Sequence, residues 1–420
     1  MSQIPHVQEL AVYLDGTPVG TLLNSREGVV HFAYDASWIA NGFALSPLPA
    51  FALQLRPFHT AHNVLGGLHG VFNDALPDGW GLMLMDRELK RTANWDPHEI
   101  RALDRLSYMG DRAMGALEFK PVMGNAKDES SLSIAALAEA AIKLEKGETG
   151  QIIRALQLQG GSPGGARPKI TIALSADGSQ CQSGFRDTPS DFEHWLVKFR
   201  ASATDPFNVG RIEMAYADMA KAAGVAMPET KLMTVDVGGQ TQDYFAVRRF
   251  DRDGNQKRHV LSISGLLEIS HRVPSLDYDA LLQAISFATR DAREVEKAYR
   301  LMVFNVLSHN KDDHAKNFAI LWNSSGWVMT PAYDLTFSTS LNNEHMTASN
   351  GRGNPTLDDM LIIAKRHSIK SSREIVFEVL TAIRHWPEHA ARWKVDGQSI
   401  NNYQRIMLAL PCRQQCENEF

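Results

Sequence analysis

Cysteine is scarce in this chain of 420 residues, which contains only Cys181, Cys412 and Cys416. Three cysteines are too few for a disulfide framework, and Cys412-x3-Cys416 lacks the second pair that a zinc site needs. The sequence also lacks any run of about 18 apolar residues, so we expect no membrane-spanning helix and no membrane partner. The first residues contain neither a basic stretch nor an apolar one, so we expect no signal peptide.

A large excess of charge of one sign is also absent. The net charge is −5, with 44% hydrophobic and 22% charged residues, which is ordinary for a globular protein. This slightly acidic balance argues against a chain that binds nucleic acid by bulk electrostatics. The length allows two or three packed units, and a cytoplasmic protein is the default expectation.

The pattern with the clearest chemical meaning is Asp312, Asn317 and Asp334. Asn317 follows Asp312 by five positions, and a predicted hairpin over residues 318–329 would bring Asp334 back toward both. Phosphoryl transfer needs one carboxylate to accept the proton of the attacking hydroxyl, while an amide oxygen and a second carboxylate hold Mg²⁺. Aspartate and asparagine are also common in ordinary loops, so this segment does not decide the function by itself.

A glycine-rich stretch over residues 160–169 could contact phosphates through its backbone N–H groups, which glycine leaves accessible. It matches neither of the common nucleotide-loop patterns, and a structural turn is the alternative. The candidate nucleotide-binding residues of this stretch are Ser162, Gly164, Gly165, Ala166 and Lys169.

A lone charge lies in the apolar strand predicted over residues 195–199. A buried Lys198 would need a partner; in kinases such a lysine contacts phosphates and pairs with a helical glutamate, for which Glu213 is the candidate. The alternative is an edge-strand lysine on the solvent face.

Further along the chain, Arg249 and Phe250 lie where a connector between the two lobes could bind adenine. The alternative is that this segment is simply a charged turn.

Asp313 and His314 belong to the same segment as Asp312. We expect His314 to orient the loop by hydrogen bonds rather than to take part in the chemistry, and it is also a candidate nucleotide-binding residue. Asp313 is expected to face away from Asp312, because adjacent side chains point in different directions. The choice of Asp312 as the base depends on its spacing to Asn317.

The periodicity of the chain predicts strands first and helices later. A hairpin at residues 10–23, a helix at 72–92 and a strand at 115–119 predict a small α+β domain over residues 1–120. A helical linker region follows over 121–157, and a β-rich, nucleotide-binding part over 158–260. The last part, 261–420, is a mostly helical catalytic lobe. This α+β order resembles a bilobal protein kinase.

Together these segments resemble the HipA family, the serine/threonine kinase toxins of bacterial type II toxin–antitoxin modules. The match covers residues 8–385, in family order. The matching stretches are Leu76–Trp80 and Gly110–Leu117 in the N-terminal subdomain, Ser162–Lys169 in the phosphate loop, Lys198 in its strand, Arg249–Arg252 in the hinge, and Asn310–Asn317 with Tyr333-Asp334 in the catalytic and metal loops.

The resemblance implies ATP and Mg²⁺ as cofactors, with Asp312 as the catalytic base and Asn317 and Asp334 as metal ligands. Lys198 would contact phosphates, and Ser162 falls where some relatives autophosphorylate. It further implies a small helix-turn-helix antitoxin of the HipB type, operator DNA bound only through that antitoxin, and an aminoacyl-tRNA synthetase as the class of protein substrate. Alternatives are a small-molecule or lipid kinase on the same fold, and a nucleotide-binding regulator without transfer activity.

Overall fold

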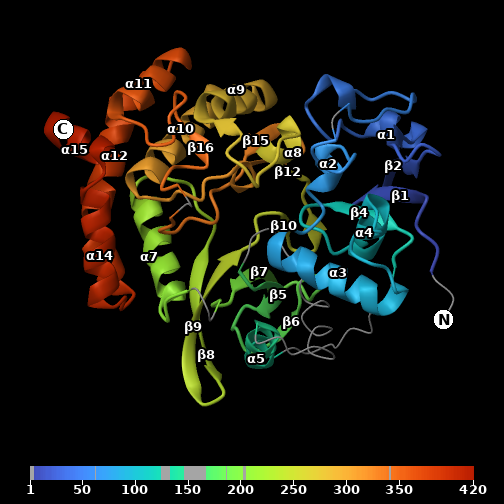
Figure 1. Cartoon of the computed structure of the whole chain (residues 1–420), viewed down its shortest axis with the longest axis horizontal. Coiled ribbons are helices and arrows are strands. Elements are labelled where there is room, and N and C mark those ends of the chain that lie inside the picture. Colours follow the sequence, from blue (N-terminus) through green and yellow to red (C-terminus); the bar gives the residue numbers. More distant parts are fainter. Residues whose placement is uncertain are drawn as a thin grey trace. The chain divides into compact units, whose positions relative to one another are not determined.

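A computed structural model describes residues 4–61, 63–123, 133–145, 167–185, 187–201, 205–339 and 342–420 (Figure 1). The chain divides into two compact units, which are Met1–Phe207 with Met233–Leu261 and Asn208–Leu232 with Ser262–Phe420. Of the helical linker region predicted over 121–157, residues 124–132 and 146–157 lie outside the described residues. The four-part domain division drawn from the sequence stays a prediction.

The first unit begins with a four-stranded sheet in the order β3-β2-β1-β4. The predicted hairpin at residues 10–23 is confirmed, because β1 and β2 pair antiparallel. Asp15 and Gly16 turn the chain with φ of 47° and 77°, the positive values that a type I′ turn requires. The elements here are β1 Glu9–Leu14, β2 Thr17–Asn24, β3 Val30–Tyr34, α1 Ala36–Asn41, η1 Pro49–Phe51, α2 Gly70–Asn73, α3 Gly79–Ala93, α4 Ala102–Met109 and β4 Leu117–Lys120.

The single helix predicted over residues 72–92 is wrong, because two helices occupy this stretch. α2 ends at Asn73 and α3 begins at Gly79. Pro77 lies between them; it has no N–H to donate and disfavours helical backbone in the residue before it. The apolar spacing that suggested one helix continues across a break that the proline enforces.

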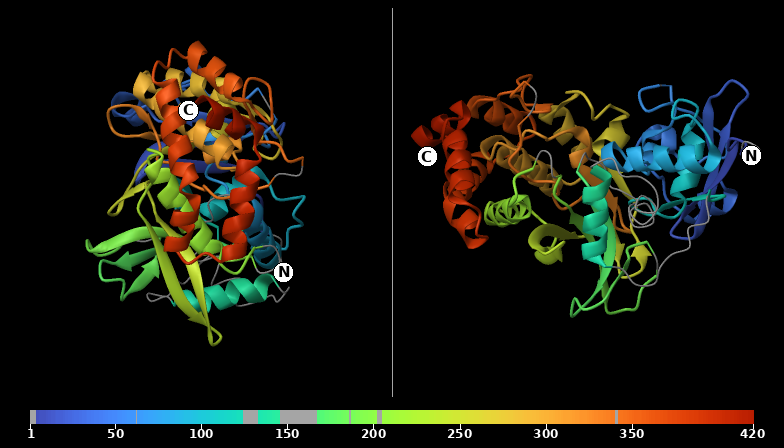
Figure 2. Two further views of the ribbon diagram at one scale, coloured as in Figure 1. Left: turned by 90° about the vertical axis from the view of Figure 1, so that its left-hand side faces the viewer. Right: turned by 60° about the horizontal axis from the view of Figure 1, so that its bottom comes forward.

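A second, five-stranded sheet of the first unit has the order β6-β5-β7-β9-β8. The strand predicted over residues 195–199 corresponds to β7, which pairs antiparallel with β5. Helices α3 and α5 contribute to one core with this sheet, and Figures 1 and 2 show α5 beside the strands. The strands of this sheet are β5 Lys169–Ser175, β6 Cys181–Ser183, β7 Phe192–Lys198, β8 Thr230–Val237 and β9 Gln240–Arg248. The other elements of this part of the chain are α5 Ile134–Glu145, β10 Arg252–Asp253, β11 Gln256–Lys257 and β12 Val260–Ser262.

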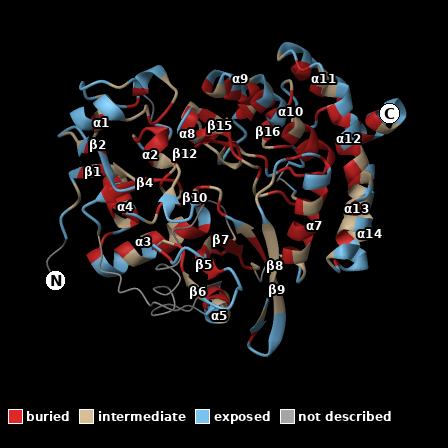
Figure 3. Ribbon diagram, turned by 180° about the vertical axis from the view of Figure 1, so that it is seen from behind, coloured by how far each residue is buried: buried red, intermediate tan, exposed pale blue. Residues whose placement is uncertain are grey.

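The second unit is mostly helical, as predicted. Its central helix is α10, whose side chains are largely buried (Figure 3). No helix within the described ranges is long and apolar enough to cross a membrane. The helices are α7 Val209–Ala222, α8 Ile263–Leu267, α9 Tyr278–Thr289, α10 Ala292–Leu307, η2 Ala315–Asn317, α11 Leu357–Arg366, α12 Ser372–Arg384, α13 Trp386–Arg392, α14 Gly397–Leu408 and α15 Pro411–Glu419.

Short strands complete the second unit and lead the chain past the candidate site. β13 Leu276–Asp277 pairs in parallel with β16 Thr347–Ala348. β14 Ala319–Trp322 and β15 Trp327–Met329 pair antiparallel, which confirms the hairpin predicted over 318–329. The side-chain oxygen of Asn323 accepts from the backbone N–H groups of Ser325 and Gly326, so the turn that returns the chain toward Asp334 is set locally.

Candidate functional site

The loop that carries the candidate base follows directly on α10. The helix ends at Leu307, and His309 then adopts a φ of 60°, which turns the chain out of the helix. Within the loop, the side-chain nitrogen of Asn317 donates to the carbonyl oxygen of Asp312 at 2.7 Å, and the backbone N–H of Asn317 donates to His314 at 2.8 Å. The predicted Asp312–Asn317 pair is therefore one hydrogen-bonded loop.

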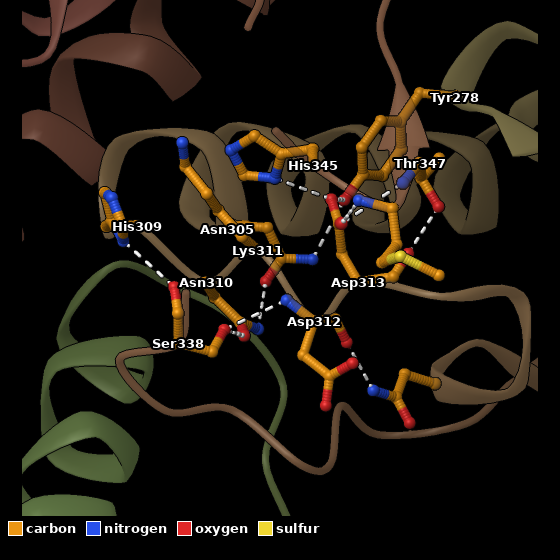
Figure 4. A network of polar contacts seen from close by, with 12 residues as sticks. Tyr278, Asn305, His309, Asn310, Lys311, Asp312, Asp313, Ser338, His345 and Thr347 are labelled. Carbon is orange, nitrogen blue, oxygen red and sulfur yellow. Dashed lines mark hydrogen bonds and ion pairs between the residues drawn. The ribbon is translucent and has the colours of Figure 1, made fainter. Parts of the chain in front are cut away.

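The neighbouring aspartates Asp312 and Asp313 lie in opposite environments. The side chain of Asp312 is 57% exposed, whereas that of Asp313 is fully buried, and Figure 4 shows the two pointing away from each other. The Asp313 carboxylate accepts from the Tyr278 hydroxyl at 2.8 Å, lies 2.8 Å from Nδ1 of His345, and accepts from the N–H groups of Met346 and Thr347. Of these two aspartates, it is Asp312 that presents its carboxylate to the solvent.

Burial fixes the protonation of Tyr278, which donates to Asp313. Burial, and then the charge of Asp313, raises the pKa of Tyr278 well above its ordinary value. Its phenol therefore keeps its proton and can donate. Asp313 therefore anchors the loop from its buried side. Its side chain points away from Asp312, as expected from the sequence.

Asp334 is joined to the loop through its neighbour. The hydroxyl of Tyr333 donates to the carbonyl oxygen of Lys316 at 2.6 Å, and these residues immediately precede Asp334 and Asn317. Asp334 itself has a φ of 57°, an uncommon value for a residue with a side chain and one that clusters at functional sites. The candidate metal ligands Asn317 and Asp334 therefore each follow one member of the hydrogen-bonded pair Lys316 and Tyr333.

His314 lies beside the candidate base. Its Nε2 is 3.8 Å from a carboxylate oxygen of Asp312, which is too long for a hydrogen bond. The ring also lies 5.6 Å from that of His271, between centroids. Its Nδ1 is buried without a hydrogen-bond partner in the described structure. The side-chain hydrogen bonds expected to orient the loop are therefore not seen, and nucleotide contact by His314 stays a prediction.

His309 and Lys311 support the loop from its buried side. The His309 ring stacks on Phe337, with centroids 4.7 Å apart, and Phe337 stacks on Tyr403 of α14 at 4.0 Å. Burial, and then the charge of Lys311, lowers the pKa of His309 to about 4, so the imidazole is neutral at pH 7. Lys311 is buried and donates to the side-chain oxygens of Asn343 and Asn354 at 3.0 and 3.1 Å.

Two candidate nucleotide residues lie together in the first unit. Lys169 of β5 and Lys198 of β7 are direct antiparallel partners, so both side chains lie on the same face of the sheet. Both are buried, and β7 is an inner strand, which excludes the solvent-facing edge lysine. Two buried ammonium groups on one face concentrate positive charge there, and Nζ of Lys198 also lies 5.4 Å from the centroid of the Phe245 ring.

Several of the other predicted nucleotide residues lie outside the described part of the first unit. Ser162, Gly164, Gly165 and Ala166 lie outside the described residues. Glu213 is buried in α7 and belongs to the second unit. Its pairing with Lys198 stays a prediction.

The predicted hinge segment contains a buried ion network. Arg249 makes two hydrogen bonds to Asp251, at 2.9 and 2.7 Å, and Arg252 adds a third at 3.1 Å. Asp251 also accepts from the N–H of Gly115 at 2.7 Å. The guanidinium of Arg249 therefore holds the turn through Asp251. Nucleotide contact by Arg249 and Phe250, expected from the sequence, stays a prediction. A solvated charged turn is excluded.

Acid should weaken this network. Burial raises the pKa of Asp251, but the charges of Arg249 and Arg252 outweigh burial and hold it well below its ordinary value. Because the pKa of Asp251 is lower in the folded than in the unfolded state, its charge contributes fully to stability above pH about 4. That contribution is lost as the pH falls further toward the pKa of the folded state. Asp251→Asn should lose this part of the acid dependence and, because it leaves buried arginines unpaired, about 3–5 kcal/mol at pH 7.

Urea unfolding followed by tryptophan fluorescence between pH 2.5 and 7 measures both effects. Asp253→Asn, which removes a carboxylate that is 62% exposed, is the matched control. An Asp251→Asn protein with the same free energy of unfolding and the same acid slope as the wild type would contradict this role of the network.

The residues that surround Asp313 and Ser338 were not found from the sequence. Tyr278, Asn305 and His345 come from distant segments, and no local pattern marks them. Ser338 lies four positions after Asp334, and only its hydrogen bonds identify it.

Two family models match this chain. The HipA-like C-terminal domain matches residues 161–394, and the HipA N-terminal domain matches residues 10–120. Two proteins of Sinorhizobium fredii, named "Putative kinase Y4dM" and "Putative kinase Y4mE", are each 24% identical to it. The first match covers 79% of this chain and 78% of Y4dM, and the second covers 78% of this chain and 77% of Y4mE.

A solved structure is similar over nearly the whole length. It is HipA of the Shewanella oneidensis MR-1 toxin–antitoxin system, in complex with HipB and its operator DNA. The match has a TM-score of 0.69 at 17% identity and covers 97% of this chain and 99% of that chain. This likeness confirms the predicted α+β, kinase-like fold.

Proposed function

Because this chain belongs to the HipA family, we propose that it is a Mg·ATP-dependent serine/threonine protein kinase and the toxin of a type II toxin–antitoxin module. The observation that carries the proposal has two parts. The carboxylate of Asp312 is exposed, and the backbone carbonyl of Asp312 accepts a hydrogen bond from the side chain of Asn317. Asp312 would accept the proton of the attacking hydroxyl as phosphate is transferred.

The residues present suit a magnesium ion. The side-chain nitrogen of Asn317 is committed to Asp312, which leaves its amide oxygen as the atom able to ligate. Asp334 adds a carboxylate. No cluster of three or more acidic, histidine or cysteine side chains that could hold a metal occurs in the described ranges, and Mg²⁺ commonly uses one or two carboxylates together with water and substrate phosphates. When bound, the ion would neutralise negative charge on the phosphates.

Binding of the ATP phosphates is assigned to the first unit. The buried pair Lys169 and Lys198 supplies positive charge on one face of the sheet. The residues of the glycine-rich stretch, Ser162 included, would complete the phosphate site. Phosphorylation of Ser162 would add about −1.5 to −2 charges, which would repel the nucleotide and switch the enzyme off.

The proposed partners follow from the family. The HipA of Shewanella oneidensis was solved with HipB and operator DNA, which supports a HipB-like helix-turn-helix antitoxin for this chain and DNA contact through that antitoxin. We propose an aminoacyl-tRNA synthetase as the class of protein substrate, whose phosphorylation would block translation. The fold does not fix the acceptor, so parallel assays with protein, metabolite and lipid acceptors distinguish this substrate class from the alternatives.

The metal assignment predicts a specific defect. Asp334→Asn and Asn317→Ala should each raise the Mg²⁺ concentration for half-maximal ATP turnover by at least about tenfold, the loss typical when supporting groups of a metal site are removed. Phosphate release over a Mg²⁺ titration measures this. Asp358→Asn, at an exposed position in the first turn of α11, is the control. Unchanged half-saturation in both site variants would remove Asp334 and Asn317 from the metal site.

A further inference from the structure

Ser338 joins the two segments that carry the candidate catalytic residues. Its N–H donates to the carbonyl oxygen of His309 at 3.2 Å, and its own carbonyl oxygen accepts from Nδ1 of His309 at 3.0 Å. Its hydroxyl oxygen accepts from the backbone N–H of Asp312 at 2.9 Å and donates to the side-chain oxygen of Asn310 at 3.1 Å (Figure 4). One residue therefore contacts three positions of the loop that holds the base.

The hydroxyl of Ser338 has only one orientation that satisfies this network. Asn310 donates its side-chain N–H to Asn305, which donates to the Tyr278 hydroxyl, which in turn donates to the carboxylate of Asp313. The buried carboxylate of Asp313 at the end of this series of hydrogen bonds fixes the direction of each donor. The amide oxygen of Asn310 is left as an acceptor, so Ser338 directs its proton there and its lone pair toward Asp312.

Ser338 lies at the end of a short segment that begins at the candidate metal ligand. Asp334 is four positions upstream, and Tyr333 on its other side is bonded to Lys316. The segment from Tyr333 to Ser338 is therefore attached to the base loop at both ends. Displacing one end would change the separation between the Asp312 and Asp334 carboxylates.

We propose that Ser338 is a positioning residue for phosphate transfer, whose hydroxyl sets the backbone of the base Asp312 relative to the segment of the metal ligand Asp334. The inference rests on the proposed kinase function. It assigns Ser338 no contact with the substrate. The step it affects is proton acceptance by Asp312 with the metal held at Asp334, so it should act on the rate of transfer more than on nucleotide binding.

The test compares Ser338→Ala with Ser338→Thr, which keeps the hydroxyl, and with Ser325→Ala in the exposed turn as the matched control. A misplacement of about 1 Å can cost 10²-fold in rate. We therefore expect Ser338→Ala to lower kcat by about 10- to 100-fold, with KM for Mg·ATP nearly unchanged and a higher Mg²⁺ concentration at half-maximal rate. Ser338→Thr should recover most of kcat, and the backbone amide of Asp312 should exchange hydrogen faster only in the alanine variant.

The outcomes separate the inference from the proposed function. Turnover by the wild type together with an unaffected Ser338→Ala protein would overturn the inference alone. So would a threonine variant as slow as the alanine variant, because the hydroxyl would then not matter. No turnover in the wild type would overturn the kinase proposal and the positioning role with it.

Discussion

Replacing Asp312 with asparagine is expected to lower kcat for phosphate transfer by about 10²- to 10⁴-fold, the usual contribution of a general base. Asparagine keeps the size of the side chain and, through its backbone carbonyl, the hydrogen bond from Asn317. The substitution removes the negative charge of the side chain and its capacity to accept a proton. Because the side chain is 57% exposed, the melting temperature should stay close to that of the wild type.

Steady-state ATP turnover and calorimetric melting on the same preparation measure this split between activity and stability. Asp358→Asn is the control, because Asp358 is an exposed aspartate in the first turn of α11. A normal kcat in Asp312→Asn would assign the base elsewhere. A large loss of melting temperature would mean that Asp312 holds the loop together instead.

The neighbouring Asp313 should show the reverse behaviour on stability. Asp313→Ala removes the acceptor of the Tyr278 hydroxyl and of the Met346 and Thr347 amides, and the partner of His345. Leaving such groups buried and unpaired should cost about 3–5 kcal/mol. At about 2–4 °C per kcal/mol, the melting transition should fall by roughly 10 °C.

Scanning calorimetry of Asp313→Ala beside Asp312→Ala compares two substitutions of the same size at adjacent positions. We expect the Asp312→Ala transition to stay near that of the wild type, since only the exposed carboxylate is lost. Equal melting temperatures for the two variants would contradict the buried anchoring of the loop by Asp313.

The structural features that the sequence predicts correctly depend on residues that lie close together in the chain. The turns at Asp15-Gly16 and Asn323–Gly326 have local chemistry that specifies a hairpin, and both hairpins are present. The spacing of Asp312 and Asn317 is local as well. The break before α3 is also encoded locally, by Pro77, but the apolar spacing of residues 72–92 continues across it and hides it from a periodicity argument.

The parts that were missed depend on contacts between distant segments. Asp312 and Asp313 are chemically identical and adjacent, and they are distinguished by Tyr278 and His345, which lie 35 and 32 positions away from Asp313. Ser338 likewise gains its role only through the loop at residues 309–312. A pattern within one segment cannot specify such partners, because folding alone brings them together.

The most direct test of the central claim is transfer of labelled phosphate from γ-labelled ATP to protein. The purified chain, with Mg²⁺, is mixed with a heat-treated bacterial lysate as acceptor, in parallel with Asp312→Asn. We expect one or more labelled proteins with the wild type and a loss of about 10²-fold or more in label with the variant. Equal labelling by both proteins, or none by either while metabolite or lipid acceptors are labelled, would contradict a protein kinase that uses Asp312 as its base.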